Sequence, residues 1–334
     1  KNDLIILWGT NIVSTHVHMV PFVEEAKKKG AKIICIDPRE TRTSAMCDWH
    51  IQPKPGTDAA LALSMMNVIV NKKKHDLKFL KNHTTGYEEF LNKILPKYTP
   101  KKASRITGIK EEDIIKLAIE YAATKKTYIR PNYGLNRHRN GGMMVRAIML
   151  LPAITGAWRN KSSGVFVGSI EEMWGVDLNK LQHPELLNGK KPREINMIQI
   201  GNALNDKKLK PPIKSLFVWN SDVANCAPDT ISVRKGLKRQ DLFTVVHETF
   251  WTDSCDYADV VLPADTALEH LDLNAPYGHY YFSLSQPAIK PLGESKSNQD
   301  LFRLLAKHMG YKEKCFQETD ESMIKNMIDA KYNP

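Results

Sequence analysis

Polar and aromatic side chains that could bind a nucleotide recur in this chain at a fixed offset of 211 residues. Each copy has two apolar runs, and the second run ends on a carboxylate. The matched pairs are Trp8 and Trp219, Asp37 and Glu248, Thr41 and Thr252, Asp48 and Asp259, and Asp58 and Glu269. Any two strand–helix–strand units share apolar strands, but this does not explain matched polar positions. The offset therefore predicts a repeated mononucleotide-binding unit.

A carboxylate at the end of the second strand has a known use in doubly wound α/β folds. It accepts hydrogen bonds from a ribose or a base edge, because the ligand lies across the carboxyl ends of the strands. Asp37 and Glu248 are predicted to take this role, with Asp48 and Asp259 at the same edge. The G-x-G-x-x-G phosphate loop is missing from both copies, which argues against an ordinary NAD or FAD site.

Asp58 has two interpretations. It ends the loop Pro55-Gly56-Thr57-Asp58 before an apolar helical pattern, so it could be the N-cap of that helix. Its carboxylate could instead accept hydrogen bonds from N1 and N2 of guanine, a pairing that adenine cannot make. The matched carboxylates elsewhere in the repeat favour the second role.

The elements that would position these residues follow from the apolar pattern. We expect strands at 4–7, 31–36 and 127–132, and helices at 20–29 and 145–154 that end near Gly30 and Gly156. The fold class is therefore α/β, with two Rossmann-like three-layer αβα domains related by the internal repeat. The predicted domains are 1–160, a connection and second domain at 161–312, and a helical tail at 313–334.

Composition is typical of a globular protein with two domains: 334 residues, 42% hydrophobic and 25% charged. The longest apolar run, 147–154, contains Pro152 and is too short for a membrane span. The five cysteines are scattered without a C-x-x-C pair, which argues against an iron–sulfur or zinc site in these residues. The net charge of +11 lies in short lysine runs without a nucleic-acid motif, so we expect no nucleic-acid partner.

The motifs, taken in order, resemble those of the molybdopterin oxidoreductases of the dimethyl sulfoxide reductase family, over nearly the whole chain to about Gly310. Single motifs are weak, but the ordered set is specific. The matching segments are 8–11 with His16, 36–39 with Thr41 or Thr43, 55–58, Gly134 with 137–138 and 140–141, 146–147, 155–156, 258–263 with Glu269, and Pro291 with 293–294.

This resemblance implies a catalytic subunit in which molybdenum or tungsten is held by two molybdopterin guanine dinucleotides. The two repeats resemble the central domains that each hold the guanosine end of one dinucleotide, and Gly134, Arg137 and His138 match a segment that approaches the pterin or pyrophosphate. The remaining implied cofactor residues are Trp8, Gly9, Asn11, Asp37, Arg39, Thr41, Gly56 and Asp58 in the first repeat, and Asn220, Ser221, Glu248, Thr252 and Asp259 in the second.

The chain also departs from the family pattern. Ile12 and Val17 stand where relatives often have proline. In relatives the cysteine-rich iron–sulfur motif and the side chain that binds the metal lie upstream of the position of Lys1, and a barrel-like domain follows. We therefore expect the chain to be the core of a larger subunit and to hold neither the metal nor the iron–sulfur cluster itself.

The function implied is two-electron redox chemistry on a small-molecule substrate, with an electron-transfer subunit as a partner. The chain alone is expected to be inactive. Two alternatives remain: a family member without metal that serves as an electron-transfer scaffold, or an unrelated nucleotide-binding module. The substrate is left open, because relatives that act on different substrates share these domains.

Overall fold

The computed structural model describes residues 2–167, 176–274 and 281–328, and the chain divides into two compact units, Lys1–Gly168 and Ser169–Pro334. The division lies eight residues after the expected end of the first domain at 160. The reason is strand β5 (Gly164–Val165), which pairs with β4 (Thr127–Pro131) and so belongs to the first sheet. Each unit is described by itself below.

The first unit is built around a parallel sheet of five strands in the order β3-β2-β1-β4-β5. Strands β1 (Leu4–Trp8), β2 (Lys32–Ile36) and β3 (Trp49–Ile51) precede β4 and β5 in the chain. This is the strand order of a Rossmann fold, in which the direction of winding reverses between β1 and β4. Ligands of such sheets bind at that switch point.

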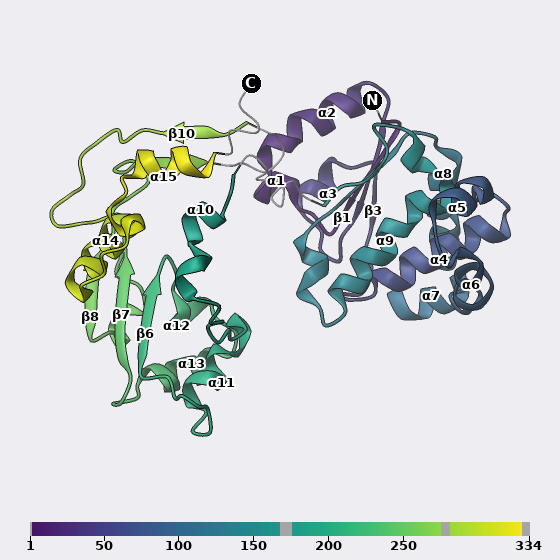
Figure 1. Cartoon of the computed structure of the whole chain (residues 1–334). Helices are drawn as coiled ribbons and strands as arrows, with labels where there is room; N and C mark the ends of the chain where they lie inside the picture. The colour runs from purple at the N-terminus through teal and green to yellow at the C-terminus, as the bar shows by residue number, and fades with distance from the viewer. Residues whose placement is uncertain (1, 168–175, 275–280, 329–334) are drawn as a thin grey trace. The chain divides into compact units, whose positions relative to one another are not determined.

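Helices cover both faces of the first sheet (Figure 1). Ile5, Leu7 and Ile33 pack on one face with residues of α1 and α2, while Ile6 and Trp8 pack on the other face with residues of α4, α8 and α9. Because both faces are buried, the central strand β1 is apolar throughout and β2 is apolar from Ile33 to Ile36. The helices of this unit are α1 (Ile12–Thr15), α2 (Val20–Lys28), α3 (Arg42–Met46), α4 (Asp58–Asn71), α5 (Leu77–His83), α6 (Tyr87–Glu89), α7 (Pro100–Thr107), α8 (Glu111–Ala123) and α9 (Gly141–Thr155).

The second unit contains a parallel sheet of three strands in the order β6-β7-β8: β6 (Ser215–Trp219), β7 (Phe243–Glu248) and β8 (Val260–Pro263). Leu216 packs with residues of α11 and α13 on one face, whereas Phe217 and Trp219 contact Phe302 of α14 on the other. The sheet therefore lies between two helical layers. The helices are α10 (Asn179–Gln182), α11 (Ile200–Asn205), α12 (Val223–Cys226), α13 (Thr230–Leu237), α14 (Asn298–Met309) and α15 (Asp320–Met327).

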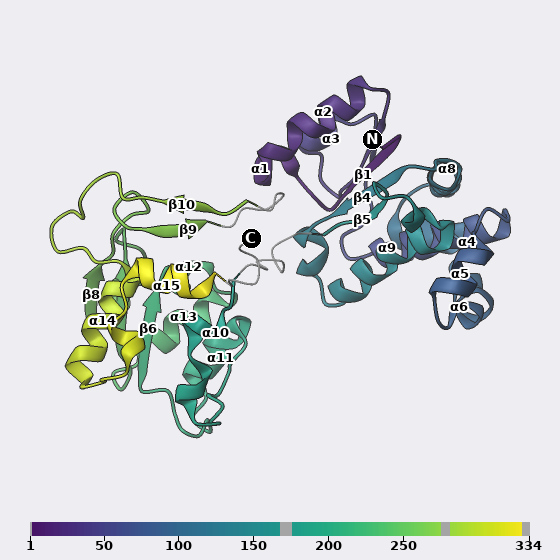
Figure 2. The ribbon, with the colours of Figure 1, turned by 45° about the horizontal axis from the view of Figure 1, so that its top comes forward.

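The second unit contains two further segments that have no sequence match in the first unit. An antiparallel hairpin of β9 (Asp272–Asn274) and β10 (Ser283–Ser285) lies beside α15 in Figure 2. Within the described residues of the expected tail at 313–334, α15 packs against α10, and Asp320 forms an ion pair with Arg303 of α14. The tail is thus part of the second unit as far as Ile328; residues 329–334 lie outside the described ranges.

The structure confirms the α/β fold class and the internal repeat. At the offset of 211 residues, β1 maps onto β6 from end to end, and α1 maps onto α12 in the same way. The third strands also correspond, after which the two units diverge: α4 follows in the first, the hairpin in the second. Within the described part of the chain, no helix combines the length and the apolar character that crossing a membrane requires.

Candidate functional site

The repeat extends to individual hydrogen bonds around the turn that follows the first strand of each unit. In the first unit the Thr43 hydroxyl donates to Asn11 Oδ1 (2.7 Å) and accepts from the backbone N of Val13 (3.1 Å). In the second unit the Ser254 hydroxyl donates to Asp222 Oδ1 (2.7 Å) and accepts from the backbone N of Ala224 (3.0 Å). These residues correspond pairwise at the same offset, so the two turns are built alike.

The first residue of each turn has a left-handed backbone. Gly9 has φ +60° and Asn220 has φ +50°, at equivalent positions directly after β1 and β6. Glycine and asparagine adopt this conformation more readily than other residues. Each turn thus lies at the carboxyl end of its strand, which is where a doubly wound sheet receives its ligand.

Asp37 lies at the carboxyl end of β2, as predicted. Its Oδ1 accepts from the backbone N of the exposed Arg39 (2.9 Å), and its carbonyl oxygen is 2.9 Å from His50 Nε2. Thr41 caps α3 through a reciprocal pair of hydrogen bonds with Ser44. The 37–41 segment is therefore held at the sheet edge with one oxygen of Asp37 bound locally.

Asp48 and Asp259 lie at the opposite edge from the one expected. The Asp48 carboxylate accepts from the backbone N of Ile33 (2.8 Å), and that of Asp259 accepts from the backbone N of Thr244 (2.6 Å). Both bonds lie at the amino ends of the sheets, and Asp259 is about four residues, or roughly 13 Å, from the Glu248 end of β7. The pair confirms the repeat, but its carboxylates join strands and do not gather with Asp37 and Glu248.

Asp58 is the first residue of α4 and is buried with 6% of its surface exposed. Its Oδ1 accepts from Nε1 of the fully buried Trp8 (2.8 Å), so Trp8 positions the carboxylate. Thr57 holds the N-cap position that the first interpretation assigned to Asp58. Burial raises the pKa of Asp58 above its ordinary value, and the hydrogen bond from Trp8 opposes the rise.

The remaining residues predicted for the first unit meet at the switch point between β1 and β4. A Cβ on Gly134 would lie 2.9 Å from the carbonyl oxygen of Gly9, and a Cβ on Gly56 would lie 3.3 Å from His138 Nδ1. His138 is close enough for its charge to lower the pKa of Asp58. The loops after β1, after β4 and before α4 therefore approach each other closely, while Arg137 is exposed beside them.

The second unit has a cavity of about 420 Å³ at the carboxyl ends of its three strands. Asn220 follows β6, Thr249 follows β7 and Asp265 follows β8, and all three line it together with Asn298 at the start of α14. Asn298 Nδ2 donates to Asn220 Oδ1 (3.3 Å). The volume lies within the usual range of small-molecule sites.

Sequence reasoning placed several residues near this edge that do not line the cavity, and it missed others that do. Glu248 ends β7 with its Oε1 bonded to the backbone N of Thr249 (2.8 Å), and Thr252 contacts Cys255. Ser221 is exposed beside Asn220. The residues missed are Thr249, Phe250, Ala264, Asp265, Thr266, Ala267, His270, Asp272, Asn298 and Gln299.

Asp265 could have been found from its position, since it follows the third strand just as Asp37 follows the second. Its Oδ1 lies 3.0 Å from His270 Nδ1, and the carboxylate is largely buried. Thr249 donates its hydroxyl to the Asp265 carbonyl oxygen (3.3 Å). No pattern in the sequence pointed to His270 or Asn298, because both reach the cavity through tertiary packing.

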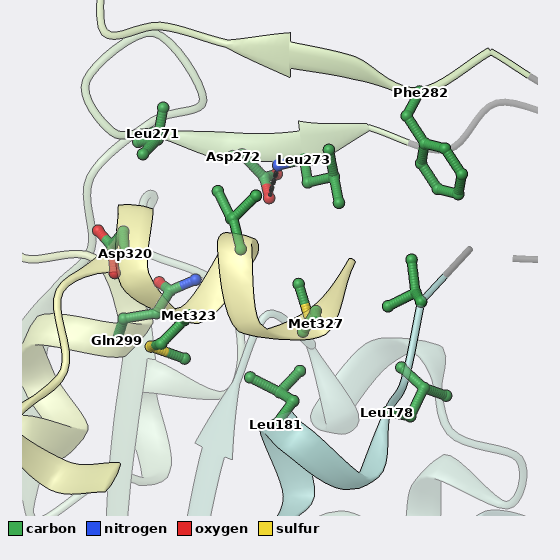
Figure 3. Close-up of a pocket in the computed structure, with 12 residues that line it drawn as sticks. Leu178, Leu181, Leu271, Asp272, Leu273, Phe282, Gln299, Asp320, Met323 and Met327 are labelled. Carbon is green, nitrogen blue, oxygen red and sulfur yellow. Dashed lines mark hydrogen bonds between the residues drawn. The ribbon is translucent and has the colours of Figure 1, made fainter. Parts of the chain in front are cut away.

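The second unit has another, apolar cavity of about 220 Å³, which Figure 3 shows. Leucine, methionine and phenylalanine side chains from the hairpin, α15 and α10 point into it. Asp272 and Gln299 line both cavities, so they form the wall between them. Among the described residues no cluster of three or more His, Cys, Asp or Glu could hold a metal ion.

The comparisons with known proteins agree with this geometry. The model of the molybdopterin oxidoreductase family matches residues 1–308. The probable oxidoreductase YoaE of Bacillus subtilis (strain 168) is 45% identical over 99% of this chain and 48% of the relative. The F420-dependent formate dehydrogenase subunit alpha of Methanocaldococcus jannaschii is 32% identical over 93% of this chain and 48% of the relative.

Among solved structures, acetylene hydratase from Pelobacter acetylenicus superposes with a TM-score of 0.78 at 25% identity, covering 98% of this chain and 50% of that one. The chain thus spans about half the length of the relatives it matches. The family match covers the first unit and the second unit as far as residue 308. The chain belongs to the molybdopterin oxidoreductase family, within the dimethyl sulfoxide reductase group.

Proposed function

We propose that this chain is the nucleotide-binding core of a molybdenum or tungsten oxidoreductase. Each unit would hold the guanosine end of one molybdopterin guanine dinucleotide at the carboxyl edge of its sheet. The observation that carries the proposal is the repeat of the turn after the first strand, down to the bridging hydroxyls of Thr43 and Ser254. Two similar ligands need two similar binding edges.

The residues of the first unit fit a guanosine. Asp58 presents a buried carboxylate with one oxygen held by Trp8, which suits acceptance from N1 and N2 of guanine. The free oxygen of Asp37 suits a ribose hydroxyl. The close approach of Gly134 to Gly9 leaves backbone groups without side chains at the switch point, as a pyrophosphate requires.

The residues of the second unit also fit a nucleotide. The lining of the cavity of about 420 Å³ offers the amides of Asn220 and Asn298 and the carboxylate of Asp265. The two amides already contact each other, so they are oriented before a ligand arrives. Arg39 and Arg137 in the first unit would supply positive charge toward phosphate oxygens, with the His138 ring beside them.

The bound metal would supply the two-electron chemistry, while the residues of this chain bind and orient the dinucleotides. The relatives are named for formate and acetylene, so we propose that these units supply cofactor binding and that substrate choice lies elsewhere in the whole protein. Relatives named as subunits support an electron-transfer partner.

Calorimetric titration of the 334-residue chain with GMP tests this function. We expect two equivalents of GMP per chain and weaker binding of AMP. Asp58→Asn should remove one equivalent. Asp48→Asn changes a carboxylate of the same unit at the opposite sheet edge. This variant should still bind two equivalents of GMP. A chain that binds no GMP, or binds AMP as well as GMP, would contradict the proposal.

A further inference from the structure

The repeat equates Glu269 with Asp58, but the two carboxylates have different surroundings. Glu269 Oε2 accepts from the backbone N of Thr266 (2.7 Å), and Oε1 accepts from the backbone N of Leu292 (2.8 Å). These bonds lower the pKa of Glu269 below its ordinary value. Both oxygens are thus bound within the unit, where they join the 266–269 turn to the segment around Leu292.

Trp219 differs from its counterpart Trp8 in the same way. Trp8 is fully buried and donates to Asp58, whereas Trp219 is 47% exposed and makes edge contact with Phe302 (5.4 Å between ring centroids). In the described part of the chain the indole of Trp219 does not bond to Glu269. The second unit therefore lacks the tryptophan–carboxylate pair that positions Asp58.

Asp265 reproduces that arrangement at another position. It is 9% exposed, close to the 6% of Asp58, and it lines the cavity at the carboxyl end of β8. One of its oxygens, Oδ1, accepts from a ring nitrogen of His270 at 3.0 Å, as Oδ1 of Asp58 accepts from Trp8 at 2.8 Å. Each unit thus contains one buried carboxylate that an aromatic N–H holds by a single oxygen.

The other carboxylate that lines the cavity, that of Asp272, is less suited to distinguishing guanine from adenine. It is exposed, and its Oδ1 accepts from the backbone N of Leu273 (2.8 Å), as Figure 3 shows. An exposed carboxylate discriminates weakly, because water replaces a lost hydrogen bond at little cost. A buried carboxylate left without donors is penalised, so it discriminates strongly.

We propose that Asp265, oriented by His270, is the carboxylate that selects guanine in the second unit, and that Glu269 has only a structural role there. This assignment rests on the proposed function. The Asp265 carboxylate would accept from N1–H and the N2 amino group of guanine, whereas adenine would present an unprotonated N1 to it. The two units would thus recognise the same base with carboxylates at positions that the repeat does not match.

The test uses the Asp58→Asn chain, in which only the second site binds the base edge. Titration with GMP, IMP and AMP gives the preference for guanine. We expect Asp58→Asn with Asp265→Asn to bind GMP at least tenfold more weakly and to lose its preference over AMP. Asp58→Asn with Glu269→Gln should keep that preference and GMP affinity within about threefold, with a lower Tm.

The reverse result, with discrimination lost through Glu269→Gln and kept through Asp265→Asn, would overturn the assignment and leave the proposed function intact. No GMP binding to the unaltered chain would overturn both. If Asp265→Asn does not fold, NMR of His270 in the Asp58→Asn chain decides. GMP should shift its ring resonances more than AMP does, and equal or absent shifts on saturation with GMP would refute contact at Asp265.

Discussion

Trp8 and Trp219 show how one residue type at one place in a repeat can have two roles. Both end the first strand of their unit, yet only Trp8 is fully buried with its Nε1 bonded to a carboxylate. The carboxylates differ too, since Asp58 accepts from the Trp8 side chain through Oδ1 whereas both oxygens of Glu269 accept from backbone nitrogens. Ligand binding at the residue scale therefore depends on which polar atoms the fold leaves without a partner.

Replacing the two tryptophans separates these roles. Trp8→Phe keeps an aromatic ring but removes the donor to Asp58, so we expect a loss of about 1.5–3 kcal/mol in the free energy of unfolding, as for a hydrogen bond to a charged group. Trp219→Phe should cost less than about 1 kcal/mol, because its ring contacts persist. Urea denaturation measures both, and equal losses would contradict the role assigned to Trp8.

Asp58 also makes stability depend on pH. Its pKa is raised by burial, so the folded chain keeps this proton to a higher pH than the unfolded chain does. The carboxyl therefore favours folding at low pH, and that contribution is lost as the pH rises through the raised pKa. We expect Asp58→Asn, without nucleotide, to have a higher Tm than the unaltered chain at pH 7.

The difference should shrink as the pH falls below the ordinary aspartate pKa of about 3.9, because the carboxyl is then protonated in both the folded and the unfolded chain. Melting curves across this range measure it. A Tm difference that grows toward low pH would mean that the Asp58 pKa is lowered in the folded chain. The same variant is expected to bind guanine more weakly, so the buried carboxylate would lower stability in return for binding.

At the scale of elements, loops from different strands must approach closely at the switch point. A Cβ on Gly134 would lie 2.9 Å from the Gly9 carbonyl oxygen, so the loop after β4 rests directly on the turn after β1. The hydroxyl bridges of Thr43 and Ser254 fix the same turn in each unit from the other side. Packing of backbone against backbone thus shapes the binding edge.

A pair of glycine substitutions tests this packing. Gly134→Ala should destabilise the chain by about 1–3 kcal/mol, because the new methyl group meets backbone that cannot move aside freely. Gly142→Ala places a methyl group in α9 with no atom within 4 Å, and it should stabilise the chain by about 0.4–1 kcal/mol. Denaturant midpoints measure both changes. A neutral Gly134→Ala would show that the two loops can separate.

At the scale of the whole molecule, each unit has its own hydrophobic core. The clusters around Trp8 and around Leu7 belong to the first unit, and those around Val233 and Val246 belong to the second. Each core is closed by helices of its own unit, so neither sheet needs the other to bury its apolar faces. The two proposed nucleotide sites can therefore be altered one at a time.

We expect two transitions in calorimetric unfolding of the chain, one for each unit. Gly134→Ala should lower the first unit's transition and leave the other in place. Expression of residues 1–168 alone should give a folded protein with the transition assigned to the first unit. A single transition that moves as a whole in Gly134→Ala would show that the units unfold together.

The amino-acid sequence by itself determined strands β1, β2 and β4, the fold class and the repeat, because apolar periodicity and glycine positions depend on local rules. It did not predict the short strands β3, β5, β9 and β10. It also located Asp37 and Glu248, since the end of a buried strand is visible as the end of an apolar run. Tertiary structure alone decided which edge Asp48 and Asp259 occupy, because a strand pattern does not show which side-chain atoms bond across to a neighbouring strand.

Tertiary structure also decided the partners of the carboxylates. Trp8 and Asp58 are 50 residues apart, and Asn298 reaches Asn220 across 78 residues, so no sequence window contains either contact. The role of a carboxylate depends on how many donors surround it and how deeply it is buried, and both follow from packing. The sequence therefore predicted that two nucleotide-binding units exist, whereas the choice among Asp58, Glu269 and Asp265 required the folded chain.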